Sequence, residues 1–303
     1  MGVLATVGMF DGVHAGHRFL LDFISQEAAR RNLSTQVITF TNHPLSIVRP
    51  EAAPKLLSSP EQKLDLILSN GIDDIVMLDF TPELQNLSAQ QFIKLLRDNF
   101  GVTHLAMGFN NSFGNDRSLT FDDFKKIGDQ VGVEIIPTPE YTENNQKVSS
   151  SVIRRLITGG DVTTASALLG RNFSLTGKVV HGRNVGHTIG FPTANIVPQF
   201  DQQIIPAKGV YAGTIDIDGI TYKTMVNIGI RPTFDSNDKS ISIEAYIDNF
   251  DGNLYDKTLT INFTRRLRDE MKFESVDQLK QQLTTDLDNL RQIPINCKSD
   301  CND

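Results

Sequence analysis

Two histidines, His14 and His17, lie three residues apart in the run GMFDGVHAGH. The run follows a short apolar segment typical of a strand and precedes a stretch with helical spacing. A helix N-terminus offers unpaired N–H groups to an anion, and two imidazoles beside it can donate hydrogen bonds to a phosphate that gains charge as it reacts. Alternatively, the histidines only cap the helix and Gly16 allows tight packing. The order of strand, glycine-rich turn and helix favours a phosphate site.

A second glycine-rich run covers residues 177–195 (GKVVHGRNVGHTIGFPTAN). It predicts a flexible loop that can place N–H groups around phosphates and that leads into a fixed turn at Pro-Thr-Ala-Asn. Within that turn, Thr193 and Asn195 offer hard oxygen ligands to Mg²⁺. The alternative is an ordinary glycine-rich hairpin, which composition alone would favour.

One carboxylate, Glu244, lies between Ile243 and Ala245 in a strand-like segment. Side chains alternate between the two faces of a strand, so the two apolar neighbours point one way and Glu244 the other. A charge in this pattern most often lies on a solvated face, and the pattern alone leaves the role of Glu244 open.

The elements that must position the histidines are predicted from the first half of the chain. Strand-like runs (VLATVG, TQVITF, DDIVML, THLAMG and VEIIPT) alternate with segments of helical spacing, such as HRFLLDFISQEAARR and AQQFIKLLRDNF. This alternation predicts an α/β doubly wound domain, with a parallel sheet covered by helices on both faces. Ligands bind beyond the carboxyl ends of such strands, which is where the histidine run follows the first strand.

The pattern changes after about residue 170. Strand-like segments follow at short intervals, separated by Gly, Asp, Asn and Pro turns, and a helix is predicted over residues 276–292. This pattern predicts an all-β antiparallel barrel or sandwich with a C-terminal helix. We expect one domain at 1–170, a second at 171–294, and a polar tail at 295–303. The tail holds Cys297 and Cys301, for which a reduced, disordered segment is favoured over a metal site.

The motifs of the first half resemble the HxGH nucleotidyltransferase superfamily, and in particular the FMN adenylyltransferase half of bacterial riboflavin kinase/FAD synthetases. The histidine run has the form G-x-F-D-G-V-H-x-G-H. Residues 40–44 (FTNHP) are similar to the F-x-P-H-P loop, 108–117 (GFNNSFGNDR) to G-x-D-x-x-F-G-x-x-R, and 148–154 (VSSSVIR) to I-S-S-T-x-I-R.

The second half resembles the riboflavin kinase family from the glycine-rich loop to the end. The matching motifs are P-T-A-N, residues 206–213 (PAKGVYAG), 227–234 (NIGIRPTF) and 265–273 (RRLRDEMKF). This resemblance implies a six-stranded antiparallel barrel, and together the two resemblances span nearly the whole chain.

The first resemblance implies that an FMN phosphate oxygen attacks the α-phosphorus of ATP and releases pyrophosphate without a covalent enzyme intermediate. His14 and His17 would contact the ATP phosphates, His17 more directly in the transition state. Ser150 and Arg154 would hold the β- and γ-phosphates. The remaining residues implied for this site are Gly8, Phe10 and Gly16 for the nucleotide and His43, Asn110 and Arg117 for the flavin; for His43 the alternative is a turn residue before Pro44.

The second resemblance implies that Glu244 is the general base, which takes the proton of the ribityl 5′-hydroxyl as that oxygen attacks the γ-phosphorus of ATP. Gly182 and Gly186 would bind the nucleotide, and Thr193 and Asn195 would hold both nucleotide and Mg²⁺. The family segment that matches Arg268 and Met271 covers the flavin ring, although a surface ion pair is an equal alternative for Arg268.

The chain departs from the family patterns at a few positions. Asn42 replaces a proline of the F-x-P-H-P loop, Asn110 replaces an aspartate, and Val185 and His187 replace arginines. Loss of a negative charge at Asn110 weakens any contact that depends on a carboxylate. Without the two arginines, the kinase loop depends more on backbone N–H groups to hold phosphate.

Composition narrows the class of protein. The formal net charge is −7 and 21% of residues are charged, without the basic stripe that a nucleic-acid partner requires. The N-terminus does not read as a cleavable signal, and no run of roughly 18 apolar residues predicts a membrane span. We therefore expect a cytoplasmic, bifunctional enzyme of flavin biosynthesis whose ligands are riboflavin, FMN, FAD and ATP. The alternatives are a riboflavin kinase only, or an inactive flavin-binding module.

Overall fold

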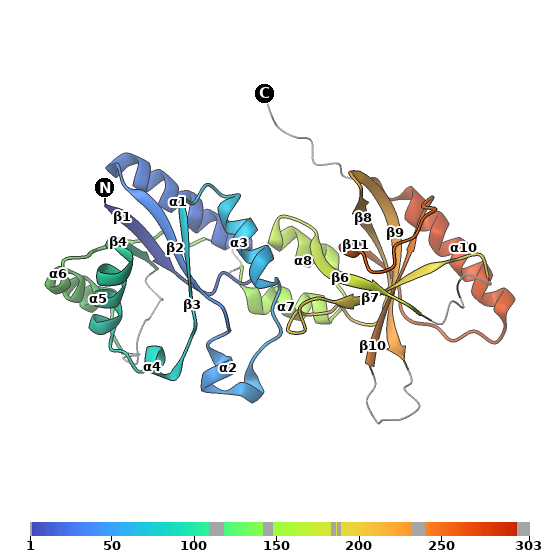
Figure 1. Cartoon of the computed structure of the whole chain (residues 1–303), viewed down its shortest axis with the longest axis horizontal. Helices are drawn as coiled ribbons and strands as arrows, with labels where there is room; N and C mark the ends of the chain where they lie inside the picture. The colour runs from blue at the N-terminus through green and yellow to red at the C-terminus, as the bar shows by residue number, and fades with distance from the viewer. Residues whose placement is uncertain are drawn as a thin grey trace. The chain divides into compact units, whose positions relative to one another are not determined.

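The computed structural model describes residues 2–108, 118–141, 148–182, 186, 189–231 and 240–295 (Figure 1). The chain divides into two compact units, Met1–Ser150 and Ser151–Asp303. This division assigns most of α7 (Ser150–Thr158) and all of α8 (Val162–Leu169) to the second unit. The domain limits expected from the sequence, with a boundary after residue 170, remain a prediction.

The first unit is built on a five-stranded parallel sheet with the strand order β3-β2-β1-β4-β5. The order reverses between β1 and β4, and in doubly wound sheets this reversal opens the crevice where ligands bind. The strands are β1 (Val3–Val7), β2 (Ser34–Phe40), β3 (Asp74–Leu78), β4 (Val102–Met107) and β5 (Glu134–Pro137).

Helices cover both faces of this sheet because its strands are apolar on both sides. Ala5, Val7 and Ile38 pack toward α5 (Ala89–Phe100) and α6 (Phe121–Val131). On the other face, Leu4 packs against α1 (Ala15–Arg31), and Val37 against α1 and α3 (Pro60–Leu68). Shorter helical segments are α2 (Leu45–Val48), the 3₁₀ turn η1 (Pro50–Ala52) and α4 (Pro82–Gln85).

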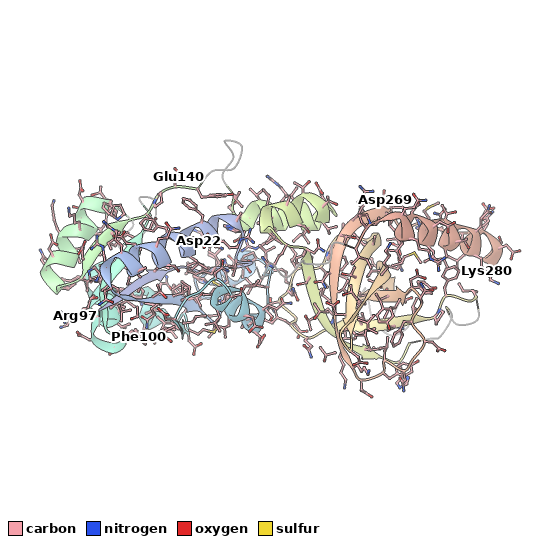
Figure 2. All side chains as sticks on the ribbon, turned by 90° about the horizontal axis from the view of Figure 1, so that it is seen from above. Asp22, Arg97, Phe100, Glu140, Asp269 and Lys280 are labelled. Atoms are coloured by element: carbon pink, nitrogen blue, oxygen red, sulfur yellow. The ribbon has the colours of Figure 1, made fainter. Side chains whose placement is uncertain are left out.

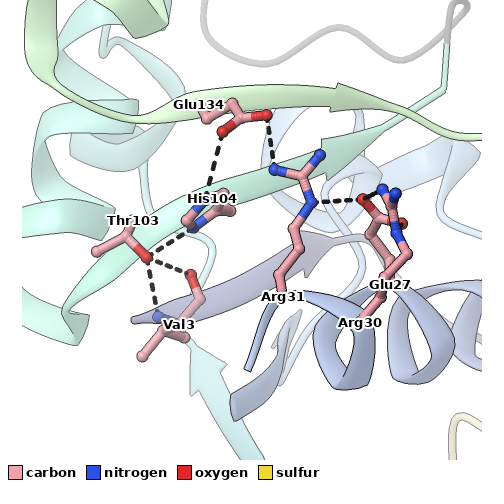
Figure 3. A network of polar contacts seen from close by, with 7 residues as sticks. All are labelled: Val3, Glu27, Arg30, Arg31, Thr103, His104 and Glu134. Carbon is pink, nitrogen blue, oxygen red and sulfur yellow. Dashed lines mark hydrogen bonds and ion pairs between the residues drawn. The ribbon is translucent and has the colours of Figure 1, made fainter. Parts of the chain in front are cut away.

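The amino edge of the sheet carries a polar network, shown in Figure 3. Arg31, at the end of α1, bonds to Glu27 one turn earlier and to Glu134 at the start of β5, with 2.8 Å between its Nη1 and the Glu134 carboxylate. Glu134 also lies 3.4 Å from Nε2 of His104 on β4. This network ties the C-terminal end of α1 to the edge of the sheet that lies opposite the histidine turn.

The second unit is a closed antiparallel barrel with the strand order β10-β7-β6-β11-β8-β9. Its interior is filled by inward-facing residues such as Phe173, Tyr211 and Phe263, each at most 1% exposed. Asp218 and Gly219 join β8 to β9 with positive φ angles of 51° and 82°, as a tight hairpin turn requires. The strands are β6 (Phe173–Val180), β7 (Thr193–Pro198), β8 (Gly209–Ile217), β9 (Ile220–Arg231), β10 (Ser240–Ile247) and β11 (Thr258–Arg268).

A C-terminal helix, α10 (Val276–Gln292), packs on the outer face of the barrel through Leu287 and Leu290 (Figure 1). Two ion pairs reinforce this packing: Arg268 of β11 with buried Asp286, and Arg291 with buried Asp248. Charged residues such as Asp22, Asp269 and Lys280, labelled in Figure 2, lie at the surface. The predicted fold class is confirmed in both halves.

Candidate active sites

The histidine run forms a strained turn between β1 and α1. Phe10 and Val13 have positive φ angles of 50° and 37°, a region that non-glycine residues rarely adopt, and Gly12 has 78°. Such strain concentrates at functional sites, where surrounding contacts hold it in place. Here the Gly12 N–H donates to Oγ of Ser58 at 3.2 Å, and the hydroxyl of Ser150 donates to the Asp11 carbonyl at 2.9 Å.

The two histidines meet directly at the start of α1. His14 is the N-cap, and its Nδ1 accepts from the His17 N–H at 3.3 Å. The two rings stack with centroids 3.7 Å apart and planes 14° from parallel. Phe10 is buried beneath them, 5.0 Å from the His17 ring. His14 therefore caps the helix, as the alternative reading expected, and its ring also stacks on that of His17.

The electrostatic setting favours a neutral His17. Burial holds the pKa of His17 well below its usual value, and the neighbouring His14 lowers it further. Its Nδ1 is buried and has no hydrogen-bond partner among the described residues. A buried polar atom without a partner is rare, so this ring fits a site that a ligand completes.

Two of the glycines predicted for this site lie against the aromatic rings of the turn. A Cβ on Gly8 would meet the Phe10 ring at 3.0 Å, and a Cβ on Gly16 would meet the His14 ring at 3.3 Å. Ser150 begins α7 and bonds to the turn as described above. Arg154 lies one helical turn further along α7, half-buried.

The loop after β2 is anchored by Asn42, one of the departures from the family pattern. Asn42 donates from Nδ2 to the Phe80 carbonyl at 3.1 Å and accepts from the Phe80 N–H at 2.8 Å. Its side chain thus extends the β2–β3 ladder by one step, which constrains the loop where the family has proline. Nδ1 of His43 accepts from the Leu45 N–H at 3.1 Å, as a turn residue would. Asn110 and Arg117 lie outside the described residues.

In the second unit, Thr193 and Asn195 lie on β7. The prediction of a fixed turn at P-T-A-N is therefore wrong: residues 193–198 pair with β6 and β10. The β10 register places Glu244 directly opposite Asn195 and Tyr246 opposite Thr193. Directly opposed residues share a face of the sheet, so Glu244, Asn195 and Thr193 form one row on the outer face of the barrel.

Two glycines of the preceding loop lie against this row. An ideal Cβ on Gly182 would stand 2.0 Å from Nδ2 of Asn195, and one on Gly186 would stand 2.2 Å from the Phe191 carbonyl and 3.4 Å from Oγ1 of Thr193. Only glycine backbone can approach so closely. The side chains of Thr193 and Asn195 therefore meet loop backbone beside the Glu244 carboxylate. Val185 and His187 lie outside the described residues.

The donor set on this row fits Mg²⁺. A hydroxyl and an amide oxygen two residues apart on one strand, with a carboxylate on the next strand, are the hard oxygen ligands that this ion takes. The ion commonly keeps several waters and binds substrate phosphates as well. Thr193 and Asn195 are thus suitable magnesium ligands.

Arg268 and Met271 differ in burial and in contacts. Arg268 donates from Nε to both carboxylate oxygens of Asp286, at 3.1 and 2.8 Å, and its guanidinium lies 5.8 Å from the Phe273 ring. Asp286 is only 2% exposed, so this is a buried ion pair with α10 and not the surface pair considered from the sequence. Met271 is 49% exposed.

Two polar side chains near the sites were missed by sequence reasoning. Asn227 of β9 lies opposite Glu244 on the side away from β7, so Glu244 has an asparagine opposite it on each neighbouring strand. Lys63 of α3 is only 3% exposed and donates to the Phe40 carbonyl at 2.6 Å. Asn227 lies in a quoted motif, but Lys63 carries no signal in a single sequence.

Fold and sites together define a class of protein: a two-unit transferase, with an HxGH-type nucleotidyltransferase unit followed by a barrel with a kinase-type site. Two family models match the chain, FAD synthetase over residues 1–152 and riboflavin kinase over residues 169–294. The chain belongs to the bifunctional riboflavin kinase/FMN adenylyltransferase family.

Full-length relatives support this assignment. A bifunctional riboflavin kinase/FMN adenylyltransferase of Pseudomonas fluorescens is 34% identical over 94% of this chain and 91% of its own. One from Listeria monocytogenes is 36% identical over 92% and 88%. A crystal structure described as a macrolide-efflux protein from Streptococcus pneumoniae superimposes with a TM-score of 0.89 and 32% identity over 97% and 95% of the two chains.

These matches confirm the family, the enzyme class and the role in flavin cofactor biosynthesis predicted from the sequence, with ATP as co-substrate. They do not favour the inactive or kinase-only alternatives. In the described part of the chain, no helix combines the length and apolar character needed to cross a membrane.

Proposed function

We propose that the first unit adenylylates FMN through His14, His17 and Ser150, and that the second unit phosphorylates riboflavin with Glu244 as general base. The observation that carries this assignment is that each unit has its own constellation. Stacked histidines cap a helix in the first, and a carboxylate lies in register with two oxygen donors in the second. Each constellation suits one of the two reactions.

In the first unit, an oxygen of the FMN phosphate attacks the α-phosphorus of ATP, the bond to the bridging oxygen breaks, and pyrophosphate leaves. The N-terminus of α1 and the neutral His17 ring donate hydrogen bonds to oxygens that gain charge in this step. His14 fixes the orientation of His17 through their stacking and the capping bond. No base is needed, because the attacking phosphate is already ionised.

In the second unit, Glu244 takes the proton of the ribityl 5′-hydroxyl as that oxygen attacks the γ-phosphorus of ATP, and ADP leaves. Gly182 and Gly186 let loop backbone approach the phosphates. Thr193 and Asn195 would hold Mg²⁺, which when bound offsets the charge of the polyphosphate. Asn227 and Asn195 flank Glu244 from the two neighbouring strands and orient it.

The ligands are riboflavin, FMN, FAD and ATP, with FMN as the product of one unit and the substrate of the other. The flavin-side contacts proposed for the first unit come from His43, Asn110 and Arg117. In the second unit, Met271 is exposed and available to cover the ring, whereas Arg268 acts by holding its segment against α10. A cytoplasmic location fits the use of ATP in both steps.

The test is a chromatographic time course of the purified protein with riboflavin, ATP and Mg²⁺, which resolves riboflavin, FMN and FAD. FMN that rises and then gives way to FAD is the expected result. FMN that accumulates without FAD would restrict the assignment to the kinase. Tight flavin retention without turnover would reject both catalytic assignments.

A further inference from the structure

A buried lysine lies behind the histidine turn. Lys63 sits in the first turns of α3, a helix that begins with a capping box between Ser59 and Gln62 and has Pro60 in its first turn. Its side chain is only 3% exposed, and its ammonium group donates to the carbonyl of Phe40 at 2.6 Å. Phe40 is the last residue of β2, immediately before the flavin-side loop. Lys63 therefore holds the carboxyl end of a central strand.

The same lysine faces the histidine turn through Asp11. The Asp11 carboxylate is 2% exposed and acts on Lys63 as a neighbouring negative charge. Asp11 also accepts from the Leu57 N–H at 2.8 Å through its side chain and from the Ser150 hydroxyl at 2.9 Å through its carbonyl. One buried cation is thus linked to the turn that carries both histidines, to the first residue of α7, and to the end of β2.

Stability does not account for this residue. Burial lowers the pKa of Lys63 to about 8 even though the Asp11 carboxylate opposes the shift, so enclosing the charge works against folding. Sites that keep a destabilising polar group often do so for activity. The geometry indicates how Lys63 could serve activity. Strands β1 and β2 are adjacent, and their ends lead to the nucleotide side and the flavin side of the proposed site.

We propose that Lys63 is a positioning residue for adenylyl transfer, which holds the histidine turn and the flavin-side loop at the separation that the reacting phosphates require. This rests on the proposed assignment of FMN adenylylation to the first unit. Lys63 belongs to the first unit and contacts the end of β2 there, so its loss is expected to affect how often the two substrates meet in a reactive geometry and to leave riboflavin phosphorylation, assigned to the second unit, unchanged.

The test is Lys63→Met, which keeps the length of the side chain and removes the charge and the donor. With enzyme in excess over FMN, the single-turnover rate constant for FAD formation is expected to fall about 100-fold, the scale of a misplacement of about 1 Å. The amplitude of FAD formation, the melting temperature and the rate of riboflavin phosphorylation are expected to stay unchanged. Lys126→Met, at a side chain that is 74% exposed, is the matched control and leaves all four unchanged.

The rate constant at saturating enzyme separates positioning from folding, because a misfolded fraction leaves the rate constant of the folded enzyme unchanged. A wild-type rate constant in Lys63→Met, with or without lost amplitude, overturns the proposal. If that variant does not fold, Lys63→Gln decides in the same way: a slower rate at an unchanged melting temperature supports the proposal and a wild-type rate overturns it. Wild-type protein that forms no FAD would instead reject the proposed function itself.

Discussion

The two units use the same co-substrate, ATP, but build their sites from different kinds of backbone. The first unit relies on a helix N-terminus, a turn with positive φ angles at Phe10 and Val13, and buried polar contacts behind it. The second unit relies on strand register, which puts Glu244 beside Asn195 on a barrel face. A reaction whose nucleophile is already ionised calls for donors and fixed geometry, whereas one that starts from a hydroxyl also calls for a base.

The largest effect expected from this contrast is that of Glu244→Gln. The amide keeps the shape of the side chain but cannot take a proton, so riboflavin phosphorylation is expected to slow by about 10³-fold. FMN-to-FAD conversion by the same sample is expected to stay intact, as measured by chromatography with each flavin supplied separately. Asp216→Asn, an exposed carboxylate on β8, is the control. Loss of both activities in a folded sample would refute the separation of the two sites.

His17→Ala is the converse variant in the first unit. Removing one donor to the developing phosphate charge is expected to slow FAD formation by about 10²-fold, with riboflavin phosphorylation unchanged. Steady-state rates with FMN and with riboflavin measure the two effects. A similar fall in the kinase rate would mean that the units do not act independently.

Gly182→Ala tests the second unit's dependence on close approach of loop backbone to the strand. The added methyl would stand 2.0 Å from Nδ2 of Asn195 and must displace it. We expect roughly a tenfold loss of kinase rate from the disturbed geometry, together with a higher Mg²⁺ concentration for half-maximal rate. A magnesium titration of both activities checks this, and an unchanged titration would argue against Asn195 as a ligand.

The smallest effect concerns pH and the stability of the first unit. Because the pKa of His17 is lowered in the folded state, the unfolded chain binds the extra proton first as pH falls below about 6.5. Stability is therefore lost as pH falls below that value, and is unaffected by this group well above it. Thermal melts between pH 7.5 and about 5.5 should show a steeper loss for the wild type than for His17→Gln. Equal slopes would contradict a neutral, buried His17.

The fold and the family were predictable because the motifs are contiguous and the elements have clear periodicity, and the same motifs named the residues of both candidate sites. The exceptions have physical causes. β7 was read as a turn because Pro192 and Asn195 are residue types that favour turns, and its pairing with the distant strand β10 is a tertiary property. Asn42 was read as a departure from proline, and only the structure pairs it with Phe80.

Lys63 shows a different limit. A lysine in an amphipathic helix is normally solvent-exposed, and nothing in PEQKLDLIL sets this one apart. Its burial depends on where α3 meets the ends of β1 and β2. Buried polar residues that lie outside the sequence motifs are therefore harder to predict than residues within them.

Helix α1 is held at both ends, by the His14 cap at its start and by the Arg31–Glu134 pair at its end. Its 17 residues form a stiff rod of about 26 Å. A rod fixed at one end transmits a tilt to the other, so the amino edge of the sheet belongs to the same mechanical unit as the histidine turn. A substitution of Glu134 that breaks its ion pair with Arg31 is therefore expected to disturb the histidine turn at the opposite end of α1.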